Sequence, residues 1–578
     1  MSKYPDIDDT DFYSKISDIY KKFKIPKKEK TLEDICFPKK FELQLPQQFL
    51  PEYINPRTPY TGVLVYHRIG AGKTCTAIRI GEKWKKLRKI IVVLPASLQG
   101  NFRNELRSLC ADDNYIKDSE RKLLTTLHPT DELYKEIISK SDERINKIYD
   151  IYSYNKFVQL SNRNEIKLGN DLLIIDEIQN MVSEEGTYYQ TLQKQINNAP
   201  DTLRIVLLSA TPMFDKPDEL ALTLNLLRLP EELPTGRDFY KKYVKIIKRK
   251  DDKYHFKTHD MDHFKNCIRG YVSYFRGAPP YVFPRMMIKY VRCEMSDFQY
   301  QAYKDVMKSE ERRYRSRIKD IMAGKALTVK NLPNNFFIGT RIVSNVVFPN
   351  RKINEQGFDS FWADKIRRDL WKYSTKFDKI ISKIERSSGK IFIYSGFKEY
   401  GGIKSLTRAL DELGYYNYFE HGEGPRRYAV WSGDESIQQK DEIRAVYNRP
   451  ENLTGRFLRI LIGSSSSKEG LSLFAVRQIH ILEPYWNQSR IDQVVGRGSR
   501  FCSHKMLPEE KRNLKVYIYI AVHPDEKETV DEYMQQLAEQ KNNLVQEFEQ
   551  AVKEAAIDCT INKNANVYEG EKEIECVF

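Results

Sequence analysis

The sequence predicts an α/β protein built from two tandem parallel-sheet domains with helical insertions and a C-terminal helix. Short apolar runs bounded by turn residues alternate with segments of helical periodicity, as in parallel sheets that helices cover on both faces. The chain has 578 residues, of which 40% are hydrophobic and 30% charged. That length is enough for about three domains that each bury a core.

The first domain is expected over residues 41–229, after an N-terminal arm over residues 1–40. Its strands are expected at Val63–Tyr66, Ile90–Leu94, Ile148–Tyr152, Leu172–Ile175 and Ile205–Leu208. A Pro-containing stretch then interrupts the pattern, and a basic, Tyr-rich connector is expected over residues 230–284.

The second domain is expected over residues 285–524, with a helical insertion at about residues 296–376. Its strands are expected at Ile391–Tyr394, Tyr428–Trp431, Leu458–Ile462, Ile479–Leu482 and Val516–Ala521. Residues 525–578 are expected to form a C-terminal helix and tail. The apolar stripe of this helix fits either packing on the domain or binding to a partner.

The most informative stretch is His67-Arg68-Ile69-Gly70-Ala71-Gly72-Lys73-Thr74, which lies between an apolar strand and a helix. Backbone N–H groups of a Gly-rich turn, together with a helix N-terminus, bind the phosphates of a nucleotide. Lys73 would then place its charge at the β- and γ-phosphates, and the Thr74 hydroxyl would bind Mg²⁺. Because His67 stands where the fuller pattern has Gly, an ordinary strand-to-helix turn is the alternative interpretation.

Two carboxylates follow the fourth expected strand, and hydroxyl residues follow the fifth. Ligands of parallel sheets bind at the carboxyl ends of the strands. Asp176 is placed there to hold Mg²⁺, and Glu177 to orient and deprotonate the attacking water. Ser209 and Thr211 can hydrogen-bond this carboxylate motif and sense the γ-phosphate.

Two arginines lie far downstream, in the segment that runs from Gln493 to Arg500. Arg497 and Arg500 are three residues apart, so they would share one face if this segment is helical. An arginine delivered from a second domain can stabilise the charge on a transferring phosphate, an effect of about 10³–10⁵ in rate. The motifs together, in this order, indicate an ATP-hydrolysing enzyme that uses Mg²⁺.

The chain resembles superfamily 2 helicases and translocases, in which two RecA-like domains hold ATP between them. The resemblance implies that Gln47 reads the adenine, with Gln48 as the alternative, and that Gln179 couples hydrolysis to the other motifs. Lys73 and Thr74 match the family's first motif.

Further residues of this chain match other motifs of the same family. Asp176 and Glu177 match its second motif, and Ser209 and Thr211 its third. Gln493 opens the last motif, in which Arg500 would be the arginine finger and Arg497 a second phosphate contact. Gly470 belongs to a stretch similar to the motif that links nucleic acid to the ATP site.

A narrower resemblance rests on four phrases: Asn55–Tyr60, Gly270–Gly277, Tyr394-Ser395 with Gly401–Ile403, and Glu554–Cys559. They resemble helicase-like ATPases of nucleocytoplasmic large DNA viruses, which include poxvirus nucleoside triphosphate phosphohydrolase I and the small subunit of the viral early transcription factor. The resemblance implies a DNA-dependent ATPase of viral transcription, present in virions and host cytoplasm. Its expected partners are nucleic acid, DNA rather than RNA, and a virus-encoded RNA polymerase or transcription-factor subunit.

Composition supports a polyanionic partner, because the formal net charge is +15. Three basic runs, Lys83–Lys89, Lys245–Lys253 and Arg312–Lys319, each fit either a phosphate track or a solvated face. No apolar run approaches the ~18 residues of a membrane span, and no signal peptide is apparent, so we expect an intracellular protein without a membrane partner.

The eight cysteines are scattered singly, without a Cys-x-x-Cys pair. This pattern predicts neither a zinc site nor a disulfide framework and fits a reducing compartment. Cys75 is accordingly expected to be a small buried residue.

Two other functions fit parts of the sequence. The first is a strand-separating DNA or RNA helicase, which needs a wedge, usually a hairpin, and no hairpin signal stands out. The second is a non-hydrolytic docking subunit, although the presence of Lys73, Glu177 and Arg500 argues against it.

Overall fold

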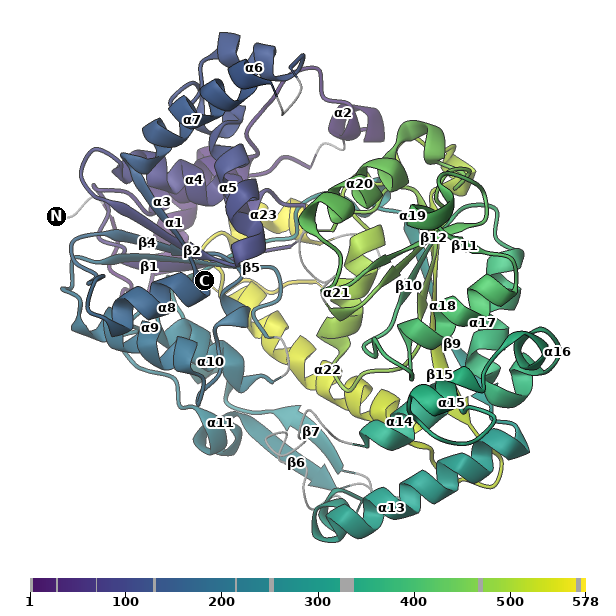
Figure 1. Cartoon of the computed structure of the whole chain (residues 1–578). Helices are drawn as coiled ribbons and strands as arrows, with labels where there is room; N and C mark the ends of the chain where they lie inside the picture. The colour runs from purple at the N-terminus through teal and green to yellow at the C-terminus, as the bar shows by residue number, and fades with distance from the viewer. Residues whose placement is uncertain are drawn as a thin grey trace. The chain divides into compact units, whose positions relative to one another are not determined.

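The computed structural model describes residues 4–27, 30–68, 70–127, 131–213, 216–248, 254–322, 337–465, 471–567 and 573–577. The chain divides into two compact units (Figure 1). Unit 1 comprises Met1–Ile247, Phe256–Pro279 and Asn543–Phe578. Unit 2 comprises Lys248–His255 and Pro280–Asn542.

Unit 1 contains a six-stranded parallel sheet of order β3-β2-β4-β5-β1-β8. Its strands are β1 (Gly62–His67), β2 (Ile90–Leu94), β3 (Tyr149–Ser153), β4 (Leu172–Ile175), β5 (Arg204–Ser209) and β8 (Val272–Phe275). Five of them are the strands expected from the sequence. The sixth, β8, lies within the stretch expected to be a connector and pairs with β1 at the edge of the sheet.

Helices cover both faces of this sheet because its apolar side chains alternate between two cores. One core contains Leu64 and Leu207 and residues of α8 (Tyr154–Asn162), α9 (Thr187–Asn198) and α10 (Asp218–Asn225). The other contains Val65 and Val206 and residues of α3 (Leu45–Tyr53), α4 (Lys73–Trp84) and α5 (Gln99–Leu106). Figure 1 shows the two groups of helices on opposite faces. Unit 1 also contains α2 (Leu32–Cys36), α6 (Asp118–Leu124), α7 (Glu132–Asn146), α11 (Gly236–Tyr243) and α12 (Met261–Cys267).

Both ends of the chain contribute to the core of unit 1. In α1 (Phe12–Ile19), Phe12 and Ile16 are fully buried, and the Phe12 ring lies edge-on to Tyr60. Near the C-terminus, α23 (Cys559–Asn566) buries Ile561 in the same core. The first helix of the expected N-terminal arm therefore packs in the core of unit 1.

Unit 2 contains a seven-stranded parallel sheet of order β11-β12-β13-β10-β14-β15-β9. Its strands are β9 (Arg285–Glu294), β10 (Lys390–Tyr394), β11 (Tyr416–Asn417), β12 (Arg427–Trp431), β13 (Ile460–Gly463), β14 (Val476–Ile481) and β15 (Asn513–Val522). All five strands expected from the sequence are present. The sequence pattern missed β9, whose side chains are mostly exposed, and β11, which has only two residues.

Helices also cover both faces of the second sheet, again with two alternating cores. The described helices of unit 2 are α13 (Asp297–Met322), α14 (Ile338–Asn345), α15 (Glu355–Asp359), α16 (Ala363–Tyr373), α17 (Thr375–Glu385), α18 (Ile403–Glu412), α19 (Tyr418–His421), α20 (Ile437–Asn448) and α21 (Gln488–Gly498). A short two-stranded sheet joins β6 (Val244–Lys248) to β7 (Tyr254–Thr258).

The long helix α22 (Val530–Glu554) crosses the unit boundary between Asn542 and Asn543. Its apolar stripe is buried: Met534 packs in a core of unit 2, and Phe548 and Val552 pack in a core of unit 1. Of the two interpretations of this stripe, packing within the protein is the correct one for these residues.

The predicted fold class is confirmed: two parallel sheets, each covered by helices, with additional helices between strands. In the part of the chain that the structure describes, no helix combines the length and apolarity needed to cross a membrane.

The expectation that the cysteines form no disulfides was wrong, whereas Cys75 is buried as expected. Cys75 and Cys110 form a disulfide across 35 residues, and Cys559 and Cys576 form one across 17 residues. Partners so far apart carry no recognisable spacing, because tertiary packing alone brings their Cα atoms to 5.7 Å.

Candidate ATPase site

The candidate site lies at the carboxyl ends of three neighbouring strands of unit 1. The sheet order places β5 between β4 and β1, and all three strands are parallel. The Gly-rich loop follows β1, the two carboxylates follow β4, and Ser209 ends β5. The predicted motifs of the first domain therefore share one edge of the sheet, where parallel sheets bind ligands.

The Gly-rich loop adopts the backbone that its two glycines permit. Gly70 has φ 85° and Gly72 has φ 71°, in the left-handed region that favours glycine. Gly72 is the N-cap of α4, so Lys73 and Thr74 are the first two residues of the helix. The described part of the loop is thus a helix N-terminus with a lysine in its first turn, as a phosphate site requires.

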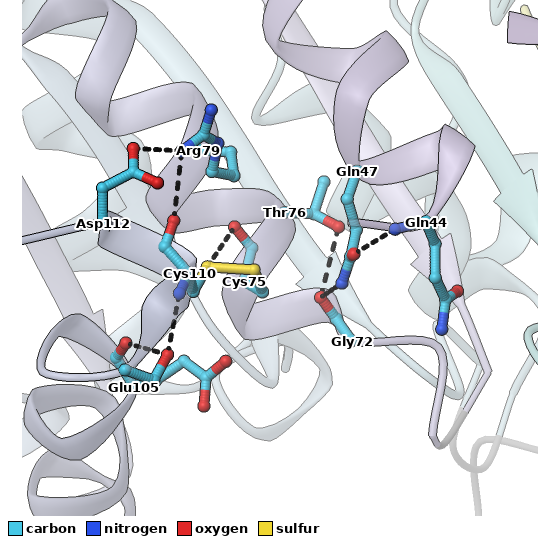
Figure 2. The surroundings of a disulfide bond; sticks show 10 residues. Gln44, Gln47, Gly72, Cys75, Thr76, Arg79, Glu105, Cys110 and Asp112 are labelled. Carbon is cyan, nitrogen blue, oxygen red and sulfur yellow. Dashed lines mark hydrogen bonds and ion pairs between the residues drawn. A yellow bond between two sulfur atoms is a disulfide. The ribbon is translucent and has the colours of Figure 1, made fainter. Parts of the chain in front are cut away.

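Gln47 on α3 lies against this loop (Figure 2). Its Nε2 donates to the Gly72 carbonyl at 3.3 Å, and its Oε1 accepts from the Gln44 N–H at 2.8 Å. A Cβ on Gly72 would lie 2.2 Å from the Gln47 Nε2. The Gln47 amide therefore joins the N-terminus of α3 to the loop, and its predicted adenine contact stays a prediction. The alternative, Gln48, is exposed and donates to the Leu43 carbonyl.

Gly277 packs against the other side of the loop. It has φ 95°, and a Cβ there would lie 3.1 Å from the Ala71 Cβ. Gly277 ends the phrase Gly270–Gly277, which resembles viral relatives, but the sequence assigned no role to this residue. Its positive φ and its contact with Ala71 supply a physical reason for glycine.

His67 is the last residue of β1 and is fully buried. Its Nε2 lies 2.9 Å from the Ser273 hydroxyl, and that hydroxyl donates to Asp558 Oδ2 at 2.6 Å. Burial, reinforced by the charge of Lys73, lowers the pKa of His67 to about 3. The ring is therefore neutral, and it joins the start of the loop to the C-terminal segment.

Asp558 is the acceptor at the other end of this network. Besides Ser273, the Tyr274 N–H donates to it at 2.9 Å, and so does the Asn562 amide at 2.9 Å. Burial raises the pKa of Asp558 to about 7, although these hydrogen bonds oppose the shift. The sequence did not predict the contact between Ser273 and Asp558. The only signal was that each of the two residues lies in a phrase shared with viral relatives.

Asp176 is buried at the end of β4. Burial and then the neighbouring Glu177 carboxylate raise its pKa to about 7, and the charge of Lys73 opposes this shift. The Tyr154 hydroxyl donates to the backbone carbonyl of Asp176 at 2.5 Å and to that of Glu177 at 2.9 Å. Asp176 and Lys73 are therefore electrostatically coupled, and Tyr154 holds the backbone turn.

Glu177, Gln179 and Ser209 form a continuous hydrogen-bond chain. Gln179 Nε2 donates to Glu177 Oε2 at 2.5 Å, and the Ser209 hydroxyl donates to Gln179 Oε1 at 2.7 Å. The Thr211 N–H donates to the Ser209 hydroxyl at 3.0 Å. Glu177 has φ 52° and ψ 46°, a left-handed backbone that costs energy for a non-glycine residue and is common at functional sites.

The two predicted arginines lie in unit 2. Arg497 Nη1 and Arg500 Nη2 both donate to the Leu471 carbonyl, at 3.3 and 3.2 Å. The two arginines do not share a helix, because α21 ends at Gly498 and Arg500 follows it. Gln493 lies on α21, half-buried, and its carbonyl accepts from Arg497 Nε. Gly470 lies outside the described residues.

The first of the three basic runs is engaged in local ion pairs. Lys83 pairs with Glu52 at 2.7 Å, Lys89 pairs with Asp150 at 2.5 Å, and Lys85 pairs with Glu82. This pairing favours a solvated face for Lys83–Lys89. The side chains of the other two runs lie largely outside the described residues.

Two groups of described residues bring cysteine, histidine or glutamate ligand atoms together. In one, Cys75 and Cys110 are already joined as a disulfide. In the other, of Glu231, His263 and Cys267, the Lys242 Nζ lies 2.9 Å from His263 Nε2 and 4.0 Å from Glu231 Oε1. An ammonium group thus already supplies the positive charge that a metal would bring there.

Comparisons with known proteins bear on the family of this chain. Residues 47–355, more than half of the chain, match the model of the SNF2-related domain. A protein of Acanthamoeba polyphaga mimivirus named as an ATP-dependent RNA helicase is 51% identical over 575 residues, and the alignment covers 99% of each chain. A termination factor NPH-I homolog of African swine fever virus is 26% identical over 569 residues, which are 87% of this chain and 76% of that protein.

Among solved structures, the helicase domain of Pyrococcus furiosus Hef aligns with a TM-score of 0.42 and 14% identity, covering 85% of this chain and 97% of that one. The family of this chain follows from how much of it the matches in sequence cover. The chain belongs to the SNF2-related family, with relatives named as helicases in giant viruses, and it is a helicase-type enzyme that hydrolyses ATP.

Proposed function

We propose that this enzyme is a nucleic-acid-dependent translocase whose ATP hydrolysis is stimulated by DNA and serves viral transcription. The observation that carries the ATPase assignment is the hydrogen-bond chain Glu177–Gln179–Ser209 beside the Gly-rich loop. The net charge of +15 supports a polyanionic partner. The names of the African swine fever virus relatives support a role in transcription.

In the proposed reaction, backbone N–H groups at the start of α4 and the Lys73 ammonium bind the phosphates of ATP. Glu177 orients the attacking water and accepts its proton. Gln179 holds the Glu177 carboxylate through its Nε2, so that the carboxylate is oriented before substrate binds.

The hydroxyl and carboxylate oxygens of Thr74 and Asp176 are the hard ligands that suit Mg²⁺. The raised pKa of Asp176 fits such a site, because a nearby divalent cation favours the charged carboxylate. When bound there, Mg²⁺ would neutralise phosphate charge. Gln47 remains the candidate for the adenine contact, with its bond to Gly72 as a link between base and loop.

Arg497 and Arg500 are assigned, by resemblance, to stabilising phosphate charge during hydrolysis. Their shared acceptor, the Leu471 carbonyl, supports a concerted role, since movement of that one carbonyl would affect both guanidinium groups. Ser209, Thr211, Gly470 and Gln493 are assigned to coupling between hydrolysis and nucleic acid.

The test of the catalytic assignment compares Lys73→Ala and Glu177→Gln with the wild type. Lys73→Ala should abolish ATP binding, and Glu177→Gln should retain binding while lowering kcat by about 10²–10⁴-fold. Lys83→Ala is the matched control, since this lysine lies on the same helix and pairs only with the exposed Glu52. Substantial ATPase activity in either of the first two variants would overturn the assignment.

The choice of nucleic acid is tested separately. ATPase activity is titrated with single-stranded DNA, duplex DNA and RNA at fixed salt, because phosphate contacts make affinity steeply salt-dependent. Stimulation by DNA and not by RNA, without strand displacement, is the expected result.

An RNA-unwinding helicase is the second candidate, and the name of the 51% identical mimivirus relative favours it. RNA stimulation with displacement of a labelled strand would establish that function in place of the first. Virus-encoded RNA polymerase and transcription-factor subunits are the proposed partners, in virions and host cytoplasm. A purified protein that binds these partners but hydrolyses no ATP would instead be a docking subunit.

A further inference from the structure

The Cys75–Cys110 disulfide lies at the start of the helix that carries the Gly-rich loop. Cys75 is the third residue of α4, two residues after Lys73, and Cys110 lies in the short helical turn Leu109–Ala111 after α5. Both side chains are buried, with exposures of 3% and 0%. The bond therefore ties the first turn of α4 to the segment that follows α5.

The first turn of α4 is held from a second direction by Gln47. Figure 2 shows the Gln47 amide on Gly72 to one side of this turn and the disulfide to the other. One turn further along α4, Arg79 donates to the Cys110 carbonyl at 3.3 Å and to Asp112 at 3.0 Å. Without the disulfide, these Arg79 bonds would still hold α4 on the Leu109–Ala111 turn, but beyond the loop.

The disulfide is thus the covalent restraint nearest to Lys73 among the described residues. A loop that must wrap phosphate groups loses conformational freedom on binding, and a restraint that acts beforehand reduces this cost. The proposed nucleotide site should therefore bind more tightly with the disulfide formed.

We propose that Cys75 and Cys110 are a reversible thiol–disulfide pair that sets the nucleotide affinity of the Gly-rich loop. This inference rests on the proposed function of that loop. Formation of the bond requires a disulfide oxidant such as oxidised glutathione. One cysteine loses its proton to solvent, and its thiolate attacks the oxidant, forming a mixed disulfide and releasing one glutathione thiolate.

The second cysteine thiolate then attacks the protein-bound sulfur of the mixed disulfide, and the second glutathione leaves. The net change is two protein thiols oxidised to one disulfide and one glutathione disulfide reduced to two thiols. Since both sulfur atoms are buried, exchange requires local opening between α4 and the Leu109–Ala111 turn. A nucleotide that holds the start of α4 in place should oppose that opening.

Linkage makes the inference quantitative. If the disulfide tightens nucleotide binding by some factor, then nucleotide binding must favour the disulfide over the dithiol by the same factor. We expect a factor of at least about 5, the lower end of typical coupling between two sites.

The experiment uses the full chain in glutathione buffers of graded composition, with and without a non-hydrolysable ATP analogue and Mg²⁺. Acid quenching, alkylation and peptide mass spectrometry give the oxidised fraction of Cys75 and Cys110. Analogue affinity is measured on the fully oxidised and fully reduced protein. The expected results are tighter binding to the oxidised form and an equal shift of the redox equilibrium.

Variants separate this pair from the other cysteines. Cys110→Ala should bind the analogue like the reduced wild type in every buffer. Cys559→Ala/Cys576→Ala, which removes the Cys559–Cys576 disulfide, should keep the redox response. If Cys110→Ala does not fold, the equilibrium shift in the wild type decides the question alone.

Equal affinity of both redox forms, or a redox response that survives Cys110→Ala, would overturn the inference and leave the proposed function intact. Absence of analogue binding in both redox forms, with Lys73→Ala indistinguishable from the wild type, would overturn the proposed nucleotide site as well.

Discussion

The Ser273 hydroxyl donates a 2.6 Å hydrogen bond to Asp558, and the same hydroxyl lies 2.9 Å from Nε2 of His67. Ser273 is on β8, Asp558 precedes α23, and His67 ends β1. One hydroxyl group therefore connects the C-terminal segment to the residue from which the Gly-rich loop departs. Any change that weakens this connection should affect both the stability of unit 1 and the loop.

Replacing Asp558 by alanine should strongly destabilise unit 1. The Tyr274 N–H, the Asn562 amide and the Ser273 hydroxyl would lose an acceptor in a buried site, at about 1–3 kcal/mol for each group left unsatisfied. We expect the free energy of unfolding to fall by on the order of 3 kcal/mol in chemical denaturation. Asp558→Asn, which keeps one acceptor oxygen, should lose less, and an alanine variant as stable as the wild type would refute the role.

The same carboxyl should make stability depend on pH. The pKa of Asp558 is about 7 in the folded protein, against about 3.9 for an aspartate in an unfolded chain. The folded state therefore binds more protons between these values. The contribution of Asp558 to stability is fully present below about pH 4 and is lost as pH rises to about 7.

The measurement is the stability difference between the wild type and Asp558→Asn at each pH, because other groups cancel in the comparison. Between pH 5 and pH 7, the free energy of unfolding of the wild type should fall by about 2 kcal/mol relative to that of Asp558→Asn. A difference that stays constant would show that Asp558 keeps one protonation state throughout this range.

Gln179 and Ser209 should act as one unit in hydrolysis. Ser209 reaches Glu177 only through the Gln179 amide in the observed hydrogen-bond chain. Gln179→Ala should lower kcat by about tenfold or more, with little change in ATP affinity, because it releases the Glu177 carboxylate. Ser209→Ala should lower kcat less.

A double-mutant cycle checks this connection. Once Gln179 is alanine, adding Ser209→Ala should cost little more, so the effects of the two substitutions on kcat should not add. Fully additive effects would mean that Ser209 acts on hydrolysis by a route independent of Gln179.

Gly72→Ala should weaken ATP binding for two separable reasons. The φ of 71° costs roughly 1–2 kcal/mol for a residue with a Cβ. The new Cβ would also meet the Gln47 Nε2 at 2.2 Å. The clash with Gln47 disappears in the background of Gln47→Ala, whereas the backbone cost of the positive φ remains.

We therefore expect Gly72→Ala to cost less ATP affinity in the Gln47→Ala background than in the wild type, measured by titration with a fluorescent ATP analogue. Gly100→Ala is the control, because a Cβ there meets no atom within 4 Å. If Gly72→Ala costs the same ATP affinity in both backgrounds, the contact between Gln47 and Gly72 does not limit the loop.

The sequence by itself determined the two parallel sheets and the positions of their main strands. Buried parallel strands are continuous apolar runs. Such runs can be recognised in the sequence at Leu172–Ile175 and Ile90–Leu94 without any knowledge of packing. It also brought Lys73, Asp176 and Ser209 to one edge of a sheet, since motifs at the carboxyl ends of neighbouring parallel strands must meet there. Edge strand β9 was missed because Lys289 and Arg292 interrupt its apolar residues, and most of its side chains are exposed.

Only the tertiary structure decided which distant residues touch. Ser273 and Asp558 are 285 residues apart, and Cys75 and Cys110 are 35 apart, so no local periodicity or spacing marks either pair. The same holds for the contact of Gln47 with Gly72, which depends on how α3 packs beside the loop. Strands and motifs depend on residues that are close together in the sequence. The hydrogen bonds and the disulfide that hold the loop arise instead from packing between segments that are distant in the sequence.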